Sequence, residues 1–173
     1  MKINFFSPAL CGLFFALAVS LSAAPVITEF MAAGQGVVED EDGDFTDWLE
    51  ITNPDPDTYL LTGHFLTDDP ENLTKWPFPA GVRIQAGRHL LVMASRKDRY
   101  NIFAGIPHTS FALEANRGYL ALVGPDQTVL SAYSNYPRQR VGHSFGTGSG
   151  GETGYFVSPT PDAPNEKALP AVV

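Results

Sequence analysis

Short runs of alternating apolar and polar residues recur along most of this 173-residue chain. Alternation with a period of two is typical of a β-strand with one buried face. Eight runs have this pattern: Val26–Met31, Trp48–Thr52, Gly63–Leu66, Val82–Ile84, His89–Ala94, Tyr119–Val123, Val129–Tyr133 and Val141–Phe145. Clusters of Pro, Gly, Asp and Asn between them predict turns. Only Arg96–Ala104 has a pattern that could form a helical turn. The sequence therefore predicts an all-β sandwich.

Two details of this pattern predict local geometry. The runs Tyr119–Val123 and Val129–Tyr133 are joined by a short GPDQT segment, which predicts a hairpin. Within Trp48–Thr52, alternation places Leu49 and Ile51 on one face. We expect those two side chains to be buried between the sheets, with Glu50 on the outside or hydrogen-bonded near an edge.

The C-terminal part of the chain departs from the pattern. Gly146–Gly154 reads GTGSGGETG, a composition typical of a flexible linker, and we expect a mobile loop there. Tyr155–Val157 could return as an edge strand. Residues 155–166 form a proline-rich closing segment, and residues 167–173 are predicted to be a frayed tail.

The N-terminus has the features of a secretory signal peptide. Lys2 supplies a positive charge, an apolar run extends from Ala9 to Leu21, and small residues follow it. We assign residues 1–23 to the signal and residues 24–166 to one domain, with a compact core over about 25–146. The prediction is a secreted or cell-envelope protein without a stable membrane anchor after cleavage.

Composition excludes several classes of function. Cys11 is the only cysteine and lies in the signal, so the mature chain has no thiol nucleophile and no cysteine-bound zinc. All 19 acidic residues but only 10 of the 11 Lys and Arg follow the signal, which gives a net charge of −9. Nucleic acid is therefore not an expected partner. The small basic group Arg96, Lys97 and Arg99 is expected to be a solvated loop.

The acidic segment DEDGD, followed by Asp47, is the one candidate metal site. Asp40, Asp42 and Asp44 recur at alternate positions, and Gly43 allows a tight turn. Calcium binds about 6–8 oxygen ligands, which carboxylates on such a loop can supply. We take Asp40, Asp42, Asp44 and Asp47 as candidate calcium ligands; the alternative is a solvated acidic turn. No other metal or cofactor site is indicated.

No catalytic constellation is evident. Glu50 has no visible acid or base partner in the sequence, and no serine lies in a nucleophile-elbow motif. The histidines are scattered rather than paired for zinc, at His64, His89, His108 and His143. His108 is expected to hydrogen-bond a turn. A hydrolase built on His108, an acid and a serine remains an alternative.

One proline-flanked segment, Trp76–Pro79, carries two large aromatic side chains. Together with Tyr133, Tyr136 and Pro137 it could form an exposed aromatic patch for glycan or peptide binding. The alternative is packing in the core at the end of the sandwich.

Several segments, in their order and spacing, resemble the lamin-tail domain family. The matching pieces are Val26–Met31, Asp47–Asn53, Leu66–Asp69, Trp76–Gly81, Ala86–Val92, His108–Phe111, Tyr119–Leu122, Ser158–Pro161 and Pro164-Asn165. They cover nearly the whole mature chain. The secreted bacterial branch is the closer match, because it too carries the acidic loop and the closing SPTP…PN.

The resemblance implies an immunoglobulin-like β-sandwich that acts as a non-catalytic module. The prediction is an exported binding or attachment module whose partner is a protein or cell-surface polysaccharide. Two alternatives remain open: a calcium-stabilised adhesion or polysaccharide-binding module, and an accessory or degenerate fragment of a secreted hydrolase.

Overall fold

The computed structural model describes residues 22–33, 37–101 and 105–170. All regular secondary structure in these ranges is β-strand, as the alternation predicts. The described residues include no helix long and apolar enough to cross a membrane. Most of the expected signal peptide, residues 1–23, lies outside the described residues.

One large sheet contains most of the strands. It is 8-stranded, in the order β14-β13-β12-β1-β2-β7-β9-β8. All its pairings are antiparallel except that of β7 with β9. The strands are β1 (Val26–Met31), β2 (Asp47–Thr52), β7 (His89–Ala94), β8 (Arg99–Asn101), β9 (Ile106–His108), β12 (Ser144–Thr147), β13 (Thr153–Phe156) and β14 (Leu169–Pro170).

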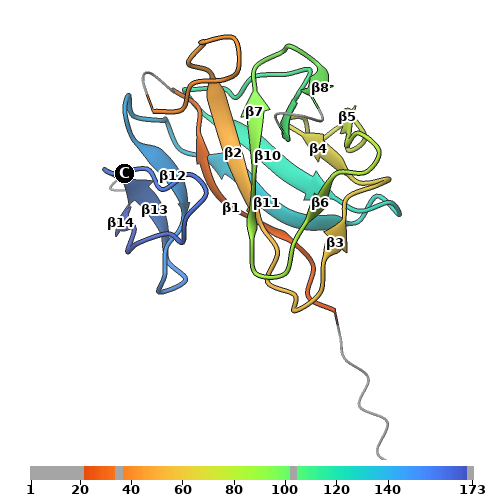
Figure 1. Ribbon diagram of the computed structural model, residues 1–173. Helices are drawn as coiled ribbons and strands as arrows, with labels where there is room; N and C mark the ends of the chain where they lie inside the picture. Colours follow the sequence, from red (N-terminus) through yellow and green to blue (C-terminus); the bar gives the residue numbers. More distant parts are fainter. Residues whose placement is uncertain (1–21, 34–36, 102–104, 171–173) are drawn as a thin grey trace, which may run out of the picture.

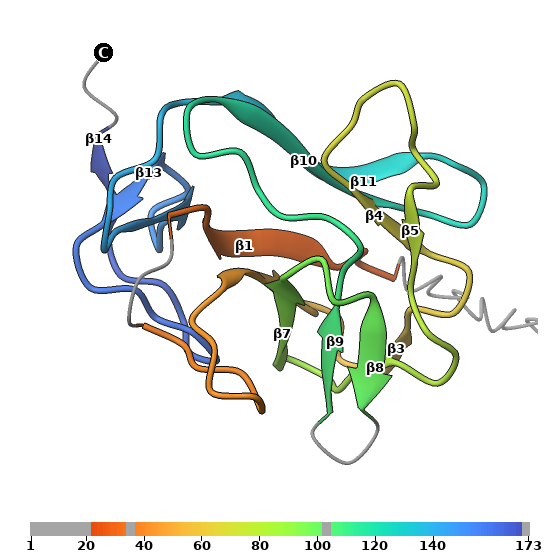
Figure 2. The same cartoon turned by 90° about the horizontal axis from the view of Figure 1, so that it is seen from above.

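A second, 4-stranded sheet has the order β11-β10-β4-β5. Its strands are β4 (Phe65–Thr67), β5 (Trp76–Pro77), β10 (Gly118–Val123) and β11 (Val129–Tyr136), and a small ladder pairs β3 (Tyr59–Leu60) with β6 (Arg83–Ile84). Seen from above, β4, β10 and β11 lie on one side of β1, β7 and β9 (Figure 2). The fold is sandwich-like, with the three-stranded unit β12–β14 set apart at one end (Figure 1).

The main core lies between the two sheets. Leu49 and Ile51 of β2 have no exposed surface and pack in the same cluster as Leu66, Leu120 and Leu122 of the second sheet. This confirms the prediction for Leu49 and Ile51. Alternation turns Trp48, Glu50 and Thr52 to the opposite, outer face of the large sheet. That outer face is also covered: Met31, Trp48 and Met93 form a second buried cluster.

Some strands agree closely with the predicted runs and others do not: residues 141–143 of the run Val141–Phe145 precede β12, and β3, β5, β8, β9 and β14 were not predicted. β1 and β7 have the predicted bounds, and β10 pairs with β11 in the predicted hairpin. The segment Arg96–Ala104, which had a pattern that could form a helical turn, contains strand β8 over Arg99–Asn101, and this strand pairs with β9. The apolar residues of so short a segment cannot distinguish the two periods.

The glycine-rich segment 146–154 is a β-hairpin rather than a long loop. Gly146 pairs with Gly154 and Thr147 with Thr153, and the turn closes with a bond from the N–H of Gly148 to the carbonyl of Glu152. A Cβ at Gly146 would collide with the Thr28 carbonyl oxygen, and one at Gly154 with that of Leu169. These two glycines therefore permit close backbone approach, a role that composition does not distinguish from flexibility.

The C-terminal end is held against the rest of the fold as far as residue 170. Tyr155 pairs with Leu169, and Ala168 is buried. The N–H of Ala168 donates to the Glu152 carboxylate at 2.8 Å. The frayed tail predicted for 167–173 is thus wrong for 167–170, and β13 is not an edge strand. Residues 171–173 lie outside the described residues.

Candidate functional site

The acidic loop is a tight turn built around Asp40. A backbone bridge joins Glu39 to Phe45, and the N–H of Asp40 donates to the carbonyl of Asp44 at 3.0 Å. The Asp40 carboxylate accepts the N–H groups of Asp42 and Asp44 at 3.0 and 3.1 Å. Gly43 has a φ of 84°, which glycine adopts without strain. The alternation of acids therefore produces a closed turn with Asp40 buried inside it.

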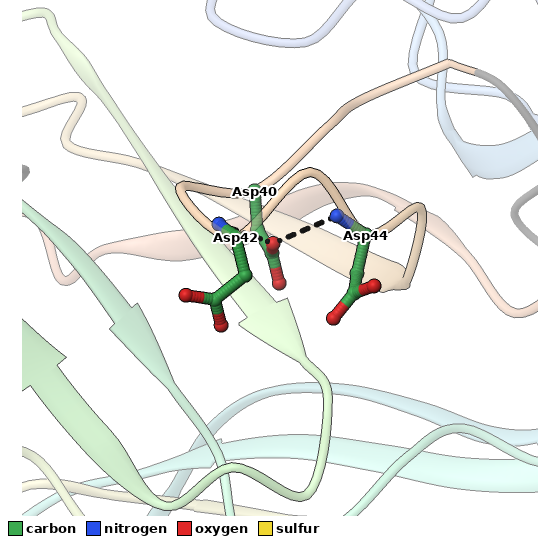
Figure 3. Close-up of side chains that lie close together, drawn as sticks. All are labelled: Asp40, Asp42 and Asp44. Atoms are coloured by element: carbon green, nitrogen blue, oxygen red, sulfur yellow. Dashed lines mark hydrogen bonds between the residues drawn. The ribbon is translucent and has the colours of Figure 1, made fainter.

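The three alternate aspartates converge, as the sequence predicts. Asp40, Asp42 and Asp44 extend to the same side of the loop (Figure 3), and each offers a carboxylate oxygen within 4.8 Å of the others. The cation that meets them is a side chain of this protein. Lys97 Nζ lies 2.6 Å from Asp40, 2.7 Å from Asp42 and 2.8 Å from Asp44.

Asp47 does not join this cluster. It is the first residue of β2, and its carboxylate accepts the N–H of Leu113 at 3.2 Å. The structure thus brings together three of the four candidate calcium ligands. Asp47 is directed elsewhere because residues after the turn enter the sheet.

Two more ion pairs extend the contact around Glu41. Arg99 Nη2 lies 3.0 Å from the Glu41 carboxylate and 2.5 Å from that of Asp42. The Nε2 atom of His108, which is fully buried, lies 2.9 Å from Glu41, and its Nδ1 lies 2.8 Å from Ser95 Oγ. His108 therefore hydrogen-bonds the acidic loop.

The ionic contacts change the titration of the loop carboxylates. Burial alone would raise the pKa of Asp40, but the bonds from Lys97 and from the N–H groups of Asp44 and Asp42 outweigh it and lower that pKa below its usual 3.8. Hydrogen bonds from Lys97 and Arg99 lower the pKa of Asp42. For Glu41, a backbone hydrogen bond is the main cause of a lowered pKa, with His108 and Arg99 contributing.

The acidic turn and the basic segment are therefore one ionic contact that fastens the 39–45 turn to the edge of the large sheet. The expectation of a solvated loop at Arg96–Arg99 is wrong for Lys97, whose side chain is only 21% exposed. The alternative of a solvated acidic turn is likewise wrong for Asp40. Sequence inspection missed this pairing, although Lys97 and Arg99 alternate as their acidic partners do.

A second polar cluster lies on the outer face of the large sheet, where β1 and β2 place Glu29 opposite Glu50. Both glutamates have no exposed surface. Glu29 accepts hydrogen bonds from the Ser144 hydroxyl and from the N–H and hydroxyl of Thr160. Glu50 accepts the N–H of Asp162 at 2.8 Å. The two carboxylates thus anchor the closing segment, which covers them.

Glu50 was expected on the outside or near an edge, without a visible acid or base partner, but it is buried and has a basic partner. Burial is the main cause of a raised pKa for Glu50; the hydrogen bond from Thr28 and the nearby His89 oppose it, and Glu29 adds to it. His89 Nδ1 lies 3.1 Å from the Glu50 carboxylate. The sequence alone could not identify His89 as the basic partner of Glu50. The two residues come close only when β2 pairs with β7, which places Thr52 opposite His89.

The aromatic segment belongs to the core. Trp76 and Phe78 are 3% and 5% exposed and belong to the main core cluster, as does Tyr136. The Trp76 indole N–H donates to Asp98 at 3.0 Å. The exposed aromatic patch is therefore wrong, and core packing accounts for these side chains.

The edge strands of the two larger sheets differ in how they are protected from pairing with another chain. The edge strands β14 and β5 have two residues each and contain Pro170 and Pro77, and β8 has three residues and begins with Arg99. Short length, proline and charge all discourage pairing with another chain. The fourth edge, β11, has eight residues, VLSAYSNY, without proline or charge. Among the described strands it is the one long edge without these protections.

The side chains of β11 hold it in place without covering its edge. The Ser131 hydroxyl accepts the N–H of Ile27 at 3.0 Å, and the Tyr133 hydroxyl donates to the carbonyl of Ile27 at 3.1 Å. Ala132 and Ser134 are exposed. The pairing of β11 with β10 is regular over Ser131–Tyr133 and shifts register on either side, and Asn135 has a φ of 57°. The regular middle of this edge can accept an added strand.

The chain matches no protein-family model and no curated protein.

Proposed function

We propose that the protein is an exported, non-catalytic binding module that captures an extended segment of a partner protein by strand addition to β11. The observation that carries the proposal is the edge strand β11 of the second sheet, which has eight residues and neither proline nor charge. Backbone hydrogen bonds would supply affinity there, and the exposed side chains of β11 would supply selectivity. The exposed side chains of β11 would therefore determine which partner segment is bound.

The lamin-tail type of the domain, its immunoglobulin-like fold and its export belong to this proposal. The order of the family-like segments supports them, and the sandwich-like arrangement of all-β sheets is consistent with that family's fold. The N-terminal apolar run with its leading lysine supports export.

The calcium-dependent alternative is not adopted, because Lys97 Nζ lies within 2.8 Å of all three converging aspartates. A divalent ion would have to displace this ammonium. The hydrolase alternative built on His108 is not adopted either. Ser95 and Glu41 hydrogen-bond the two ring nitrogens, as a serine and an acid would in a triad, but His108 has no exposed surface, so a substrate cannot reach its ring.

The test uses a displayed library of extended peptides selected on the mature protein. Because N–H groups of neighbouring strand residues point to opposite edges, either Ser131→Pro or Ala132→Pro removes an outward N–H. The melting temperature identifies which one, since the other substitution breaks the ladder with β10 and destabilises the fold.

The edge-blocking proline variant should keep the melting temperature of its matched control and lose the selected peptides. The control is wild type for Ala132→Pro and Ser131→Ala for Ser131→Pro, because both Ser131 variants lose the hydroxyl that accepts the N–H of Ile27. Ser134→Ala, which leaves the backbone intact, should retain the peptides. Failure to enrich any peptide, or equal binding to the proline variant, would refute strand addition at β11.

A further inference from the structure

A cavity of about 260 Å³ opens on the outer face of the large sheet, lined by residues other than those of the acidic loop. Tyr133 of β11 hydrogen-bonds the hydroxyl of one lining residue, Thr147, at 2.9 Å. Its floor is formed by strand residues, one wall by the turn of the β12–β13 hairpin and the other by the closing segment. The residues that matter for its chemistry are Thr28, Thr52, His89, Ser149, Pro164 and Asn165.

The donor and the acceptor can be assigned for each hydrogen bond beneath this cavity. The Thr28 hydroxyl donates to the Glu50 carboxylate at 2.7 Å. Its oxygen lies 2.9 Å from the Thr52 hydroxyl, which must therefore donate to Thr28. His89 Nδ1 lies 2.8 Å from Thr52 Oγ1 and 3.1 Å from Glu50 Oε1. Because an ionised carboxylate only accepts, Nδ1 must carry the hydrogen.

This assignment leaves one acceptor, on the His89 ring, without a partner. In the neutral ring a hydrogen on Nδ1 leaves a lone pair on Nε2. Within the described part of the chain, no group hydrogen-bonds Nε2, while the ring lines the cavity. The Asn165 amide is used inside the protein, where it donates to the carbonyls of Thr28 and Thr147, both at 2.9 Å. The cavity therefore needs a ligand that donates.

The charge beneath the cavity is negative. Glu29 and Glu50 are both buried, and His89 is the sole basic group within ion-pair distance of either among the described residues. With neutral His89, either of these carboxylates, when ionised, lacks a cationic partner among the described residues. A buried charge of this kind favours a cation nearby and disfavours an anion.

We propose that this cavity binds a primary ammonium group on an aliphatic stem, such as a lysine side chain. The ammonium has three donors and no acceptor, so it can donate to the lone pair on Nε2, and its charge is complementary to that of the buried glutamates. The methylenes of the stem pack against Pro164 and the threonine methyl groups. The site is independent of strand addition at β11.

The test is a titration of the mature protein with Nα-acetyl-lysine amide, followed by NMR of the histidine rings. The neutral comparison ligands are the norleucine analogue, which lacks the ammonium, and the 6-hydroxynorleucine analogue, which carries a hydroxyl in its place. In the free protein His89 should have its hydrogen on Nδ1, and the lysine probe should shift its Nε2 resonance. His89→Leu and Glu50→Gln should each weaken binding by roughly tenfold or more. His143→Leu, a change at a histidine outside the cavity, should leave binding unchanged.

Three outcomes would overturn the proposal. One is a hydrogen on His89 Nε2 in the free protein. Another is equal binding of either neutral analogue, which would remove the role of charge. The third is undiminished binding of the lysine probe to His89→Leu. The melting temperature of His89→Leu verifies that this variant is folded. The test therefore stays valid even where Glu50→Gln alters the closing segment.

Discussion

Lys97 and Asp40, 57 positions apart in the sequence, are joined by an ion pair of 2.6 Å. The same ammonium contacts Asp42 and Asp44, so three like charges that would otherwise repel one another share one cation. The pair connects the acidic turn to the segment that leads into β8. It gives the most acidic stretch of the chain a structural role.

Replacing Lys97 by methionine should lower the melting temperature, because the three carboxylates would then face each other without a cation. Calcium should restore part of this loss in the variant and should not shift the melting temperature of the wild-type protein. Lys167→Met, a control outside the cluster, should leave both properties unchanged. A calcium-induced shift in the wild type equal to that in Lys97→Met would contradict the structural role of Lys97.

The same contact predicts an acid-dependent stability. The pKa values of Asp40 and Asp42 are lowered below 3.8 in the folded state. Their stabilisation is therefore fully present above the unfolded pKa and is lost as the pH falls through the lowered values. The difference in melting temperature between wild type and Lys97→Met should shrink as the pH falls through this window. A constant difference would show that the contact does not depend on ionised carboxylates.

Glu29 is predicted to hold the closing segment in place. Its carboxylate accepts three hydrogen bonds, two of them from Thr160, which is 131 positions away. Glu29→Ala should reduce the free energy of unfolding by roughly 1.5–3 kcal/mol, the range for hydrogen bonds to a charged group. Denaturant unfolding measures this loss, and backbone hydrogen exchange should be faster across residues 158–165. Unchanged exchange there would argue against an anchoring role.

The glycine-rich hairpin offers a matched pair of substitutions. Gly154→Ala should destabilise the fold by about 1–3 kcal/mol or more, because its Cβ would meet the backbone of Leu169. At Gly150 the nearest atom belongs to the Glu152 carboxylate, which can shift more easily than backbone although it accepts the N–H of Ala168, so Gly150→Ala should cost less than Gly154→Ala. Thermal unfolding of the two variants checks the contrast, and equal stabilities would mean that 146–154 is flexible as its composition indicates.

Which features of this protein the sequence alone predicts depends on how far apart in the chain the interacting residues lie. The bounds of β1 and β7 follow from strict alternation, because burial of one sheet face imposes it locally. The convergence of Asp40, Asp42 and Asp44 is also local, since one turn contains all three. The ammonium of Lys97 and the base beside Glu50 depend on which strands become neighbours. Local pattern does not contain that information.

Hydrogen exchange of the backbone amides of β11, with and without a library-selected peptide, tests the central claim most directly. Strand addition predicts that binding slows exchange at the residues of β11 whose N–H groups point away from β10, which alternate along the regularly paired part Ser131–Tyr133. The protected edges β5, β8 and β14 should exchange as before. Unchanged exchange along β11, with protection gained elsewhere, would contradict the account.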